Sequence, residues 1–574
     1  MRPSPVSGAP NAVHQAASPD DATPELRYLG WKTMPFVIGN ETFEKLGSIG
    51  TAANLMMYLT SVFHMTNVDA AMALNAFSGT TNLATVLGAF ASDLYLGRYA
   101  TVAIGCIATF IGMIILTLTA GVPTLHPPPH AGATRLQLAV LLLAFVFIVA
   151  GAGGIRPCNL AFGADQFDPR TEHGRRGINS FFNWYYFTFT IAVCVSSTAI
   201  IYVQSNVSWW LGFAIPAALM LVSCALFFAG ARLYVRVRPE GSPLAGAIRV
   251  AAAAFRNRHA PAPDDPGKSL FRAPHASSLV SRLPYTDQFR SLDKAAVVVL
   301  KSEVGLDGIP KDPWRLCSMQ QVEETKCMLR VLPVWATCIV HYIAFAQTNT
   351  YVVLQAAQSD RHCRAGGGFE APPGSFTIFP MLALTIWIPL YDRLVVPWMK
   401  RLTGRDEGIT LLQRMGVGMA LSSVAMIISG AVEQRRRVLA RGKVVSRQSA
   451  FWLVPQLAVL GLSEAFNQVS QMEFYYKEFP ENMRSVAGSL LFSGLALSNY
   501  LSGLLVSVVH RATGGGDEGW LAEDLNRGRL DWFYFLIAAI GVVDLVVFLV
   551  CADWYRYKVP ADAHDHQQIA LGNP

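Results

Sequence analysis

The chain has 574 residues, of which 52% are hydrophobic and only 15% are charged, whereas a soluble domain carries about 25% charged residues. This composition excludes a string of soluble domains and indicates a polytopic membrane protein, since each spanning helix needs about 20 mostly apolar residues. The net charge of +7, from 46 basic and 39 acidic residues, is mild and is spread between apolar runs, which argues against a nucleic-acid partner.

The chain opens with a polar tail. Residues 1–30 are rich in Pro, Ala and Ser and lack the continuous apolar core of a signal peptide. We expect a disordered, cytoplasmic N-terminal tail there.

Two sets of six apolar runs follow the tail, each run long enough to span a bilayer. Between the sets lies a long polar segment, 238–325, with "RNRHAPAPDDPGKS" at its Pro-rich centre. The pattern predicts an all-α membrane protein with 12 transmembrane helices in two six-helix bundles, at 31–237 and 326–556, with a cytoplasmic linker between them and a cytoplasmic tail at 557–574. This layout is typical of the major facilitator superfamily, in which the substrate site lies near the midplane between the bundles. The expected spans are 33–61, 70–93, 99–121, 136–163, 179–203, 209–236, 326–349, 374–398, 408–432, 450–476, 484–510 and 531–555.

Charge in the loops gives the predicted orientation. An even number of spans places both termini on one side, and most basic loop residues fall on that side, which the positive-inside rule assigns to the cytoplasm. One loop disagrees: "EQRRRVLARGKVVSR" at 433–447 would be external although it is strongly basic, and the sequence suggests no role for Arg435–Arg441. The residues that support the orientation are Arg98, Arg170, Arg175, Arg176, Lys400, Arg401 and Arg405.

Three charged side chains interrupt the first apolar run, in the stretch "ETFEK". Glu41, Glu44 and Lys45 are spaced i, i+3, i+4, so on a helix they share one face. A turn at the membrane surface is one interpretation, but apolar sequence continues on both sides. Burial and the proximity of two carboxylates disfavour ionisation of all three groups, so a carboxyl here can take up and release a proton. We therefore predict that Glu41 and Glu44 are the proton acceptors of a coupled transporter, because ionisable residues inside spans are functional by default.

A second motif, "GAGGIRPCNLAFGADQFDP" at 151–169, ends the fourth run. No βαβ pattern surrounds its glycines, which excludes a dinucleotide site, and we expect them to allow close helix packing. Arg156 needs a carboxylate or an anionic substrate, because an unpaired guanidinium is costly at that depth. Glu464 in the tenth run is the candidate partner, with Asn467 on roughly the same face. A pair that forms in one conformation and breaks in the other would couple protonation to gating; a static structural pair is the alternative.

The remaining reactive residues do not indicate an enzyme. The nine cysteines are scattered, and no pair has zinc-ligand or redox spacing. The chain also lacks a metal-ligand cluster, a G-x-S-x-G elbow and a phosphate-binding loop. We expect no enzymatic activity, no metal, and no cofactor, with protons as the coupling ion.

These motifs resemble those of a known family. "ETFEK" looks like the E-x-x-E-[RK] motif of the proton-coupled oligopeptide transporter family, called in plants the nitrate transporter 1/peptide transporter family. "GGIRPCNLAFGADQFDP" resembles its signature around the fourth span, and "LPYTDQFRSLDKAA" and "DPWRLCSMQQVEETKCMLRVLPVW" resemble the plant branch's linker and the start of its seventh span. "QMEFYYKEFPENMRSVAGSL" and "WLAEDLNRGRLDWFYF" extend the likeness to nearly all of residues 28–558. The likeness is greatest to the subfamily that includes nitrate and glucosinolate transporters.

The resemblance implies inward proton symport by alternating access. It assigns proton coupling to Glu41, Glu44 and Lys45. It also places Arg156 and Glu464 at the family's charge positions in the fourth and tenth spans.

A further likeness concerns the loop between the second and third spans. "GAFASDLYLGRYAT" is similar to a superfamily motif, which implies that Asp93 and Arg98 are cytoplasmic gate residues. Thr101 occupies a place where some nitrate transporters carry a regulatory phosphothreonine, which implies a regulatory kinase as a partner. The alternative for Thr101 is a helix cap.

Departures from the family pattern bear on the substrate. Leu46, Ser48 and Ile49 replace the Phe and the two Tyr of peptide-transporting relatives, whose tyrosines contact peptide, so peptide transport is disfavoured. Arg156 stands where many relatives carry Lys, and its planar fork suits carboxylate, sulfate or nitrate. An anionic substrate is therefore favoured.

The seventh span, "YIAFAQTNT", bears on the choice between anions. Phe345 stands two residues before Gln347, where some nitrate transporters carry a histidine. His341 lies one helical turn earlier, on nearly the same face. Nitrate could bind to Arg156 and amide donors, whereas a larger anion would also gain Phe345 as a stacking surface.

The leading prediction is a proton-coupled symporter of an anion, most simply nitrate at low affinity, in a plant plasma membrane. The partners implied are the small anion and the lipid bilayer. One alternative is transport of a larger organic anion, such as a glycosylated metabolite or a hormone. Another, from a different class, is a nitrate sensor or receptor.

Overall fold

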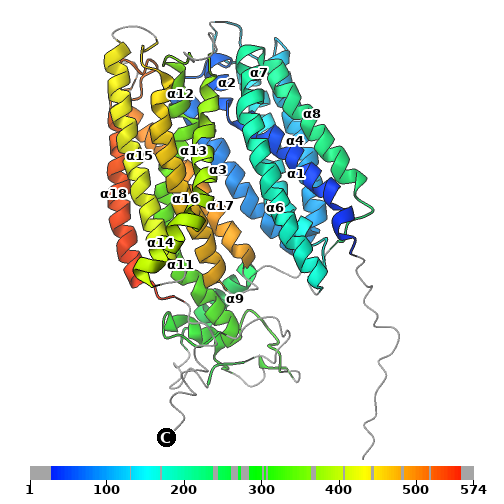
Figure 1. Ribbon diagram of the computed structural model, residues 1–574. Helices are drawn as coiled ribbons and strands as arrows, with labels where there is room; N and C mark the ends of the chain where they lie inside the picture. The colour runs from blue at the N-terminus through cyan, green and yellow to red at the C-terminus, as the bar shows by residue number, and fades with distance from the viewer. Residues whose placement is uncertain are drawn as a thin grey trace, which may run out of the picture.

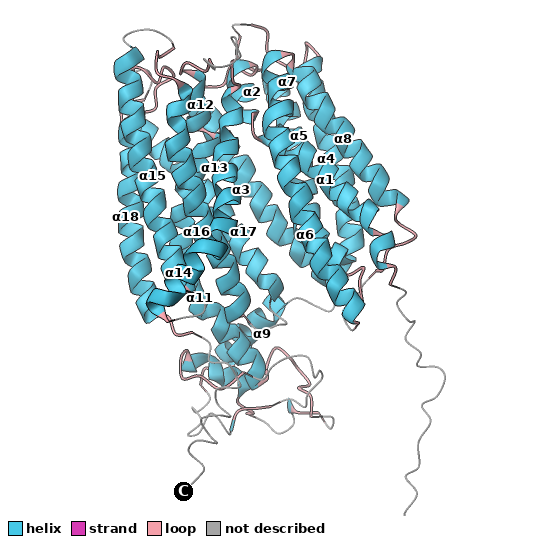
Figure 2. Cartoon of the chain, in the orientation of Figure 1, coloured by secondary structure: helices cyan, strands magenta, loops and turns pink. Residues whose placement is uncertain are grey.

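The computed structural model describes residues 28–129, 131–168, 171–236, 243–259, 269–272, 283–299, 303–305, 308–362, 370–404, 408–440, 445–479, 484–515 and 519–557. Over these residues the chain is almost entirely helical (Figures 1 and 2), and its only β-type pairing is a few isolated bridges. The expected tails at 1–30 and 557–574 lie outside the described residues, apart from 28–30 and 557.

The first half of the chain forms the N-terminal bundle. A break at Ala53 and Asn54 divides its first span into two helices, and a π-helical turn at Ser196–Ile200 joins two helices into its fifth span. The helices are α1 (Met34–Ala52), α2 (Leu55–Ser61), α3 (Asn67–Ala91), α4 (Gly97–Gly121), α5 (Arg135–Ala164), α6 (Glu172–Val195), α7 (Ile201–Asn206) and α8 (Trp209–Ala229).

The second half forms one linker helix and the C-terminal bundle. Two of its spans are also interrupted, by a short 3-10 turn at Gln347–Asn349 and by a π-helical turn at Tyr391–Val395. The helices are α9 (Pro243–Arg256), α11 (Met319–Ala346), α12 (Tyr351–Ala357), α13 (Ile378–Leu390), α14 (Val396–Thr403), α15 (Leu411–Ala440), α16 (Val454–Glu478), α17 (Arg484–Ala512) and α18 (Leu530–Trp554).

The helices account for all the expected spans. Nine segments of the described chain are long and apolar enough to cross a membrane, and one of them, Asn67–Gly121, holds both α3 and α4. The helical conformation is interrupted between α3 and α4 at Gly97, the first residue of α4. Its φ of 73° is a backbone conformation that favours glycine. The two remaining spans, α1 with α2 and α16, are more polar but lie among the other helices (Figure 1). The prediction of twelve spans in two six-helix bundles is confirmed.

The linker lies earlier in the chain than predicted, because α8 already ends at Ala229 and not near 236. Helix α11 begins at Met319 instead of 326, because Ser318 and Gln321 form a reciprocal cap: the Ser318 hydroxyl accepts from the Gln321 N–H, and the Gln321 side chain accepts from the Ser318 N–H. The linker also contains α9, which packs on α11.

A buried charge cluster fixes the linker to α11. The Lys326 side chain is fully buried, with its Nζ 2.6 Å from Asp293 Oδ1 of the linker and 2.9 Å from Glu323 Oε1. The thiol of Cys317 is buried in the adjoining core, and this burial raises its pKa to about 11. The linker segment is therefore joined to the C-terminal bundle through α11.

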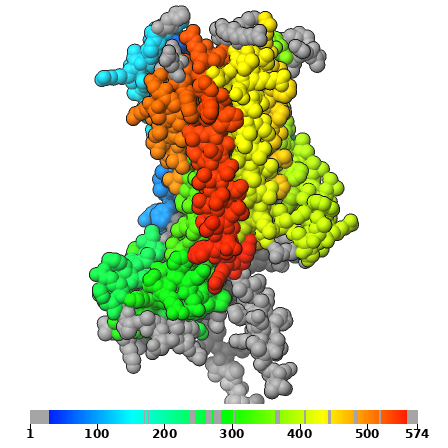
Figure 3. Space-filling view, turned by 90° about the vertical axis from the view of Figure 1, so that its left-hand side faces the viewer, coloured from blue at the N-terminus to red at the C-terminus, as the bar shows by residue number. Residues whose placement is uncertain are grey.

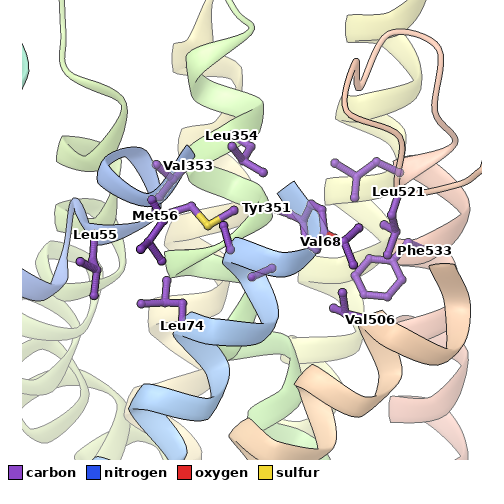
Figure 4. Close-up of a cluster of buried hydrophobic side chains, with 14 of the residues drawn as sticks. Leu55, Met56, Val68, Leu74, Tyr351, Val353, Leu354, Val506, Leu521 and Phe533 are labelled. Atoms are coloured by element: carbon purple, nitrogen blue, oxygen red, sulfur yellow. The ribbon is translucent and has the colours of Figure 1, made fainter. Parts of the chain in front are cut away.

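The two bundles meet at the end of the molecule opposite the linker. One hydrophobic core there combines side chains of both bundles (Figure 4). A polar contact joins the bundles at the same end: Glu523 Oε1 accepts a hydrogen bond of 2.6 Å from the backbone N–H of Asn67, the first residue of α3. Core members labelled in Figure 4 include Leu55, Met56, Val68 and Leu74 of the N-terminal bundle and Tyr351, Val353, Leu354, Val506 and Phe533 of the C-terminal bundle.

At the linker end the bundles have separate cores. One core is built from side chains of α1, α4, α5, α6 and α8, and the other from side chains of α11, α15, α16, α17 and α18. Among the described residues, a hydrophobic core shared by both bundles therefore lies at the end away from the linker.

Candidate substrate and proton site

Helix α1 carries the three charged residues of "ETFEK" into the interior of the N-terminal bundle. Glu41 and Glu44 are each 1% exposed. Lys45 Nζ lies 2.9 Å from Glu44 Oε2 and 3.4 Å from Glu41 Oε1. All three lie within an unbroken helix and face other helices, so the alternative of a turn at the membrane surface is wrong.

Two further residues hold Glu41 in place. The Tyr185 hydroxyl of α6 donates a hydrogen bond of 2.5 Å to Glu41 Oε1, and the Asn159 amide of α5 donates to Glu41 Oε2. Neither residue was predicted from the sequence. Asn159 follows Arg156 by three residues, so the two share a face of α5, and this spacing could have found it.

Arg156 of α5 faces the same cluster. Its guanidinium interacts electrostatically with Glu44 and Glu41. Among the described residues, however, no carboxylate oxygen lies within 4.0 Å of it and it makes no hydrogen bond. The chain thus holds a cation inside the bundle without a direct partner from its own described residues.

Arg156 and Glu44 line one small cavity inside the N-terminal bundle. Its volume is about 30 Å³, which has room for roughly two water molecules or an ion of similar size. The Thr109 hydroxyl on its wall is buried and has no hydrogen-bond partner in the described part of the chain. The other lining residues are Ser48, Thr51, Ala52, Phe77, Thr81, Met113, Ile148 and Ala152.

Glycines of α5 let the neighbouring helices α3 and α4 pack closely against α5 beside this cavity. A Cβ added at Gly151 would lie 1.9 Å from Thr109 Oγ1 of α4, and one added at Gly153 would lie 2.8 Å from the Ala84 carbonyl oxygen of α3. Both distances are too short for a side chain. The prediction that these glycines serve close helix packing is confirmed.

Glu464 lies on α16 in the C-terminal bundle and is not paired with Arg156. No described cation lies within 4.0 Å of its carboxylate, and its Oε2 is buried without a hydrogen-bond partner in the described chain. A static structural pair is therefore excluded. An ion pair between Arg156 and Glu464 that forms only in another conformation stays a prediction.

The predicted residues of the seventh span do not reach the cavity. The Gln347 amide donates hydrogen bonds of 3.1 Å to the Ile343 carbonyl and to Ser502 Oγ. Phe345 is half-buried, with its ring centroid 6.0 Å from that of His341. Both side chains thus belong to the packing of the C-terminal bundle in this conformation.

Asn467 and His341 both contact α15. The Asn467 amide donates to the Met415 carbonyl at 3.5 Å, and His341 Nδ1 lies 3.1 Å from Ser422 Oγ. Of the residues predicted to bind the substrate, only Arg156 lines the cavity.

The predicted gate residues have a third member. Arg98 Nη1 lies 2.5 Å from both carboxylate oxygens of Asp165, the residue that ends α5. Asp93 acts on Arg98 electrostatically but makes no ion pair with it. Asp165 was not predicted from the sequence, although it stands in the motif "GADQF" at the end of the fourth span.

Thr101 lies inside α4 and is 5% exposed, and its hydroxyl donates to the Gly97 carbonyl at 2.9 Å. Leu96, not Thr101, occupies the cap position of α4, so the alternative of a helix cap is wrong. A kinase would need this packing to open before it could reach the hydroxyl.

The basic segment Arg435–Arg441 is mostly part of α15, and two of its arginines pair with acidic residues of the protein. Arg436 is fully buried and lies 2.7 Å from Glu433, and Arg437 lies 3.0 Å from Asp531 of α18. The Arg435 guanidinium lies over the Trp452 ring, 4.3 Å from its centroid. Arg441 lies outside the described residues. These contacts explain why a basic loop stands at the end opposite the linker, against the simple charge rule.

Ionisable groups buried within a fold of two six-helix bundles are the mark of a membrane transporter of the major facilitator type, and comparisons with known proteins agree. The family model described as the POT family matches residues 99–521. The chain belongs to this family, whose members in these comparisons are transporters and not enzymes.

Relatives and solved structures cover nearly the whole chain. Protein NRT1/PTR FAMILY 2.11 of Arabidopsis thaliana is 51% identical, over 92% of this chain and 89% of the relative, and protein NRT1/PTR FAMILY 2.9 of the same plant is 50% identical, over 94% of each. The crystal structure of the POT family transporter PepTSo matches with a TM-score of 0.67 and 18% identity, covering 91% of this chain and 98% of that one. An auto-inhibited POT family peptide transporter matches with a TM-score of 0.66 and 21% identity, covering 92% and 99%.

Proposed function

We propose that the protein is a proton-coupled symporter of a small anion, with nitrate the leading substrate. The observation that carries the proposal is the Arg156 guanidinium, which lines a small cavity beside Glu44 and has no partner among the described residues. Even a half-buried cation inside a membrane bundle is costly unless an anion balances it. The planar fork of arginine suits a planar oxyanion such as nitrate.

The charge balance of the cluster supports coupling to protons. With all four groups ionised, Glu41 and Glu44 balance Lys45 and Arg156, and the cluster is neutral. A bound nitrate would leave one net negative charge in a poorly solvated interior, which is costly. One proton on either carboxyl removes that charge, so we infer that one proton accompanies each anion.

The open and closed ends of the structure support alternating access. Among the described residues, the core that the bundles share lies at the end away from the linker, and the cores at the linker end are separate. We infer from the basic loops that the linker end faces the cytoplasm. The conformation is then inward-facing, and in the outward-facing state Arg156 and Glu464 would pair across the bundles. For a symporter driven by external acid, we propose the plasma membrane.

Uptake by purified protein in liposomes tests this proposal. With acid outside, labelled nitrate should accumulate above its external concentration, and a protonophore or equal pH on both sides should abolish the accumulation. A panel of organic anions is the matched comparison. Absence of nitrate uptake at every concentration, with uptake of an organic anion, would overturn nitrate in favour of the larger substrate.

A further inference from the structure

Linker helix α9 is apolar on two sides. On one side Val250, Ala253 and Ala254 are buried in a small core shared with α11. On the other side Ile248 and Phe255 are 58% and 67% exposed. These two stand seven residues apart, with small alanines between them on the same face, so they form one exposed apolar stripe. A helix surface that faces only water gains nothing from such a stripe.

The edge of this stripe is basic. Helix α9 has no acidic residue, and Arg249 and Arg256 lie beside the stripe, again seven residues apart. Arg258 follows directly, with its guanidinium 4.6 Å from the centroid of the Phe255 ring. Arg256 Nη1 lies 4.0 Å from Asp312 Oδ2, at the outer limit of an ion pair. The exposed stripe is thus bordered by cations that are only weakly compensated.

The position of α9 suits contact with lipid. It packs against both α11 and α17 at the end of the bundle where the linker lies. In Figure 3 the green linker region below the bundle extends sideways beyond the transmembrane helices above it. A helix at that place lies beneath the lipid that surrounds the bundle.

We propose that α9 lies in the headgroup layer of the cytoplasmic leaflet and binds anionic phospholipid. The inference rests on the orientation in the proposed function, but not on the transported substrate. Ile248 and Phe255 enter the boundary between headgroups and acyl chains, and Arg256 and Arg258 contact the headgroup phosphate and carboxylate. An apolar stripe with an arginine border is the pattern of interfacial helices, and the cytoplasmic leaflet is negatively charged. Because Lys326 fixes the linker to α11, this contact anchors the C-terminal bundle to the leaflet.

Photo-crosslinking of the full-length protein tests the proposal. The protein is placed in nanodiscs of phosphatidylcholine alone, or of three parts phosphatidylcholine to one part phosphatidylserine, with a photoreactive acyl chain on a trace of each lipid. Crosslinks to residues 243–258 should concentrate on phosphatidylserine. Replacing Arg256 or Arg258 by Gln should lower the crosslinked fraction about fivefold each at low salt.

Variants of the stripe separate insertion from simple charge attraction. The double change Ile248→Glu with Phe255→Glu should abolish crosslinking, and it leaves the buried side of α9 intact. Val299→Glu is the control, because Val299 is a 53% exposed apolar residue of the linker outside α9. Equal crosslinking in the stripe variant and in the control would overturn the proposal. So would crosslinks from a photoreactive residue at position 255 to another segment of the chain, to a second copy or to another protein. Nitrate uptake, measured in parallel, distinguishes failure of this inference from failure of the proposed function.

Discussion

The two carboxyls of α1 differ in their surroundings. Glu41 accepts hydrogen bonds from Tyr185 and Asn159, which fix its position, whereas Glu44 lines the cavity beside Arg156. Glu44 is therefore the carboxyl that a bound anion would approach, and Glu41 completes the charge balance through Lys45. Substitution of Glu44 and substitution of Glu41 should therefore have different effects on transport.

The change Glu44→Gln should remove proton coupling. Without a titratable carboxyl at the cavity, accumulation driven by a pH gradient should fall by more than about tenfold, because the proton can no longer offset the charge of the anion. Exchange of labelled for unlabelled anion, measured in liposomes without a gradient, should persist. Glu172→Gln is the control, since that side chain is 74% exposed. Gradient-driven uptake equal to the unmodified protein would contradict the role of Glu44, and a retained downstream response without uptake would favour the sensor alternative.

The change Arg156→Gln should weaken anion binding. Loss of a charge-assisted hydrogen bond is worth about 1.5–3 kcal/mol, so affinity measured by calorimetry should fall about 10- to 100-fold. Arg156→Lys keeps the charge but not the fork and should lose less affinity. Unchanged affinity in both variants would place the anion elsewhere.

Helix packing around the site depends on close backbone contacts. A Cβ added at Gly88 of α3 would lie 1.8 Å from the Gly153 carbonyl oxygen of α5. Gly88→Ala should therefore force α3 and α5 apart, at a cost of about 1–3 kcal/mol. The melting temperature of the purified protein measures this. Gly488→Ala in α17 is the control, because nothing lies within 4 Å of its added Cβ, and equal melting temperatures would refute the packing argument.

The linker is held by the buried Lys326. The change Lys326→Met leaves Asp293 buried without its cation and leaves Glu323 with the more distant Arg330, at 3.7 Å, which should cost about 3–5 kcal/mol. The linker should then detach from α11 and become susceptible to limited proteolysis. The exposed Lys311, changed to Met, is the control. Identical cleavage rates in both variants would show that the cluster does not hold the linker.

The contact between Glu523 and Asn67 joins the two bundles across the closed end. It can exist only while this end is closed, because α3 and the loop that carries Glu523 belong to different bundles. Glu523→Ala removes a hydrogen bond to a charged acceptor, so the ratio of closed to open forms should fall about tenfold or more. Distances between spin labels on α2 and α12 report this shift. Asp69→Asn, at the same end of α3 but bonded only to Thr66, is the control.

The sequence determined the elements and the main charges of the site. Long apolar runs fix the spans because a lipid interior requires backbone groups to pair within a helix. The spacing of Glu41, Glu44 and Lys45 fixes a shared face, and the glycines before Arg156 fix close packing. These features are local, so one sequence suffices to read them.

Only the tertiary structure decided which groups meet. Tyr185 and Asn159 reach Glu41, Asp165 pairs with Arg98, and Asp531 of α18 pairs with Arg437 of α15, all through contacts between segments distant in sequence. It also placed the cavity within the N-terminal bundle and left Glu464 apart from Arg156. The physical reason is that a helix periodicity gives the direction of a side chain around its own axis but not the neighbour it faces. That neighbour depends on how twelve helices pack and on which end of the two bundles is closed.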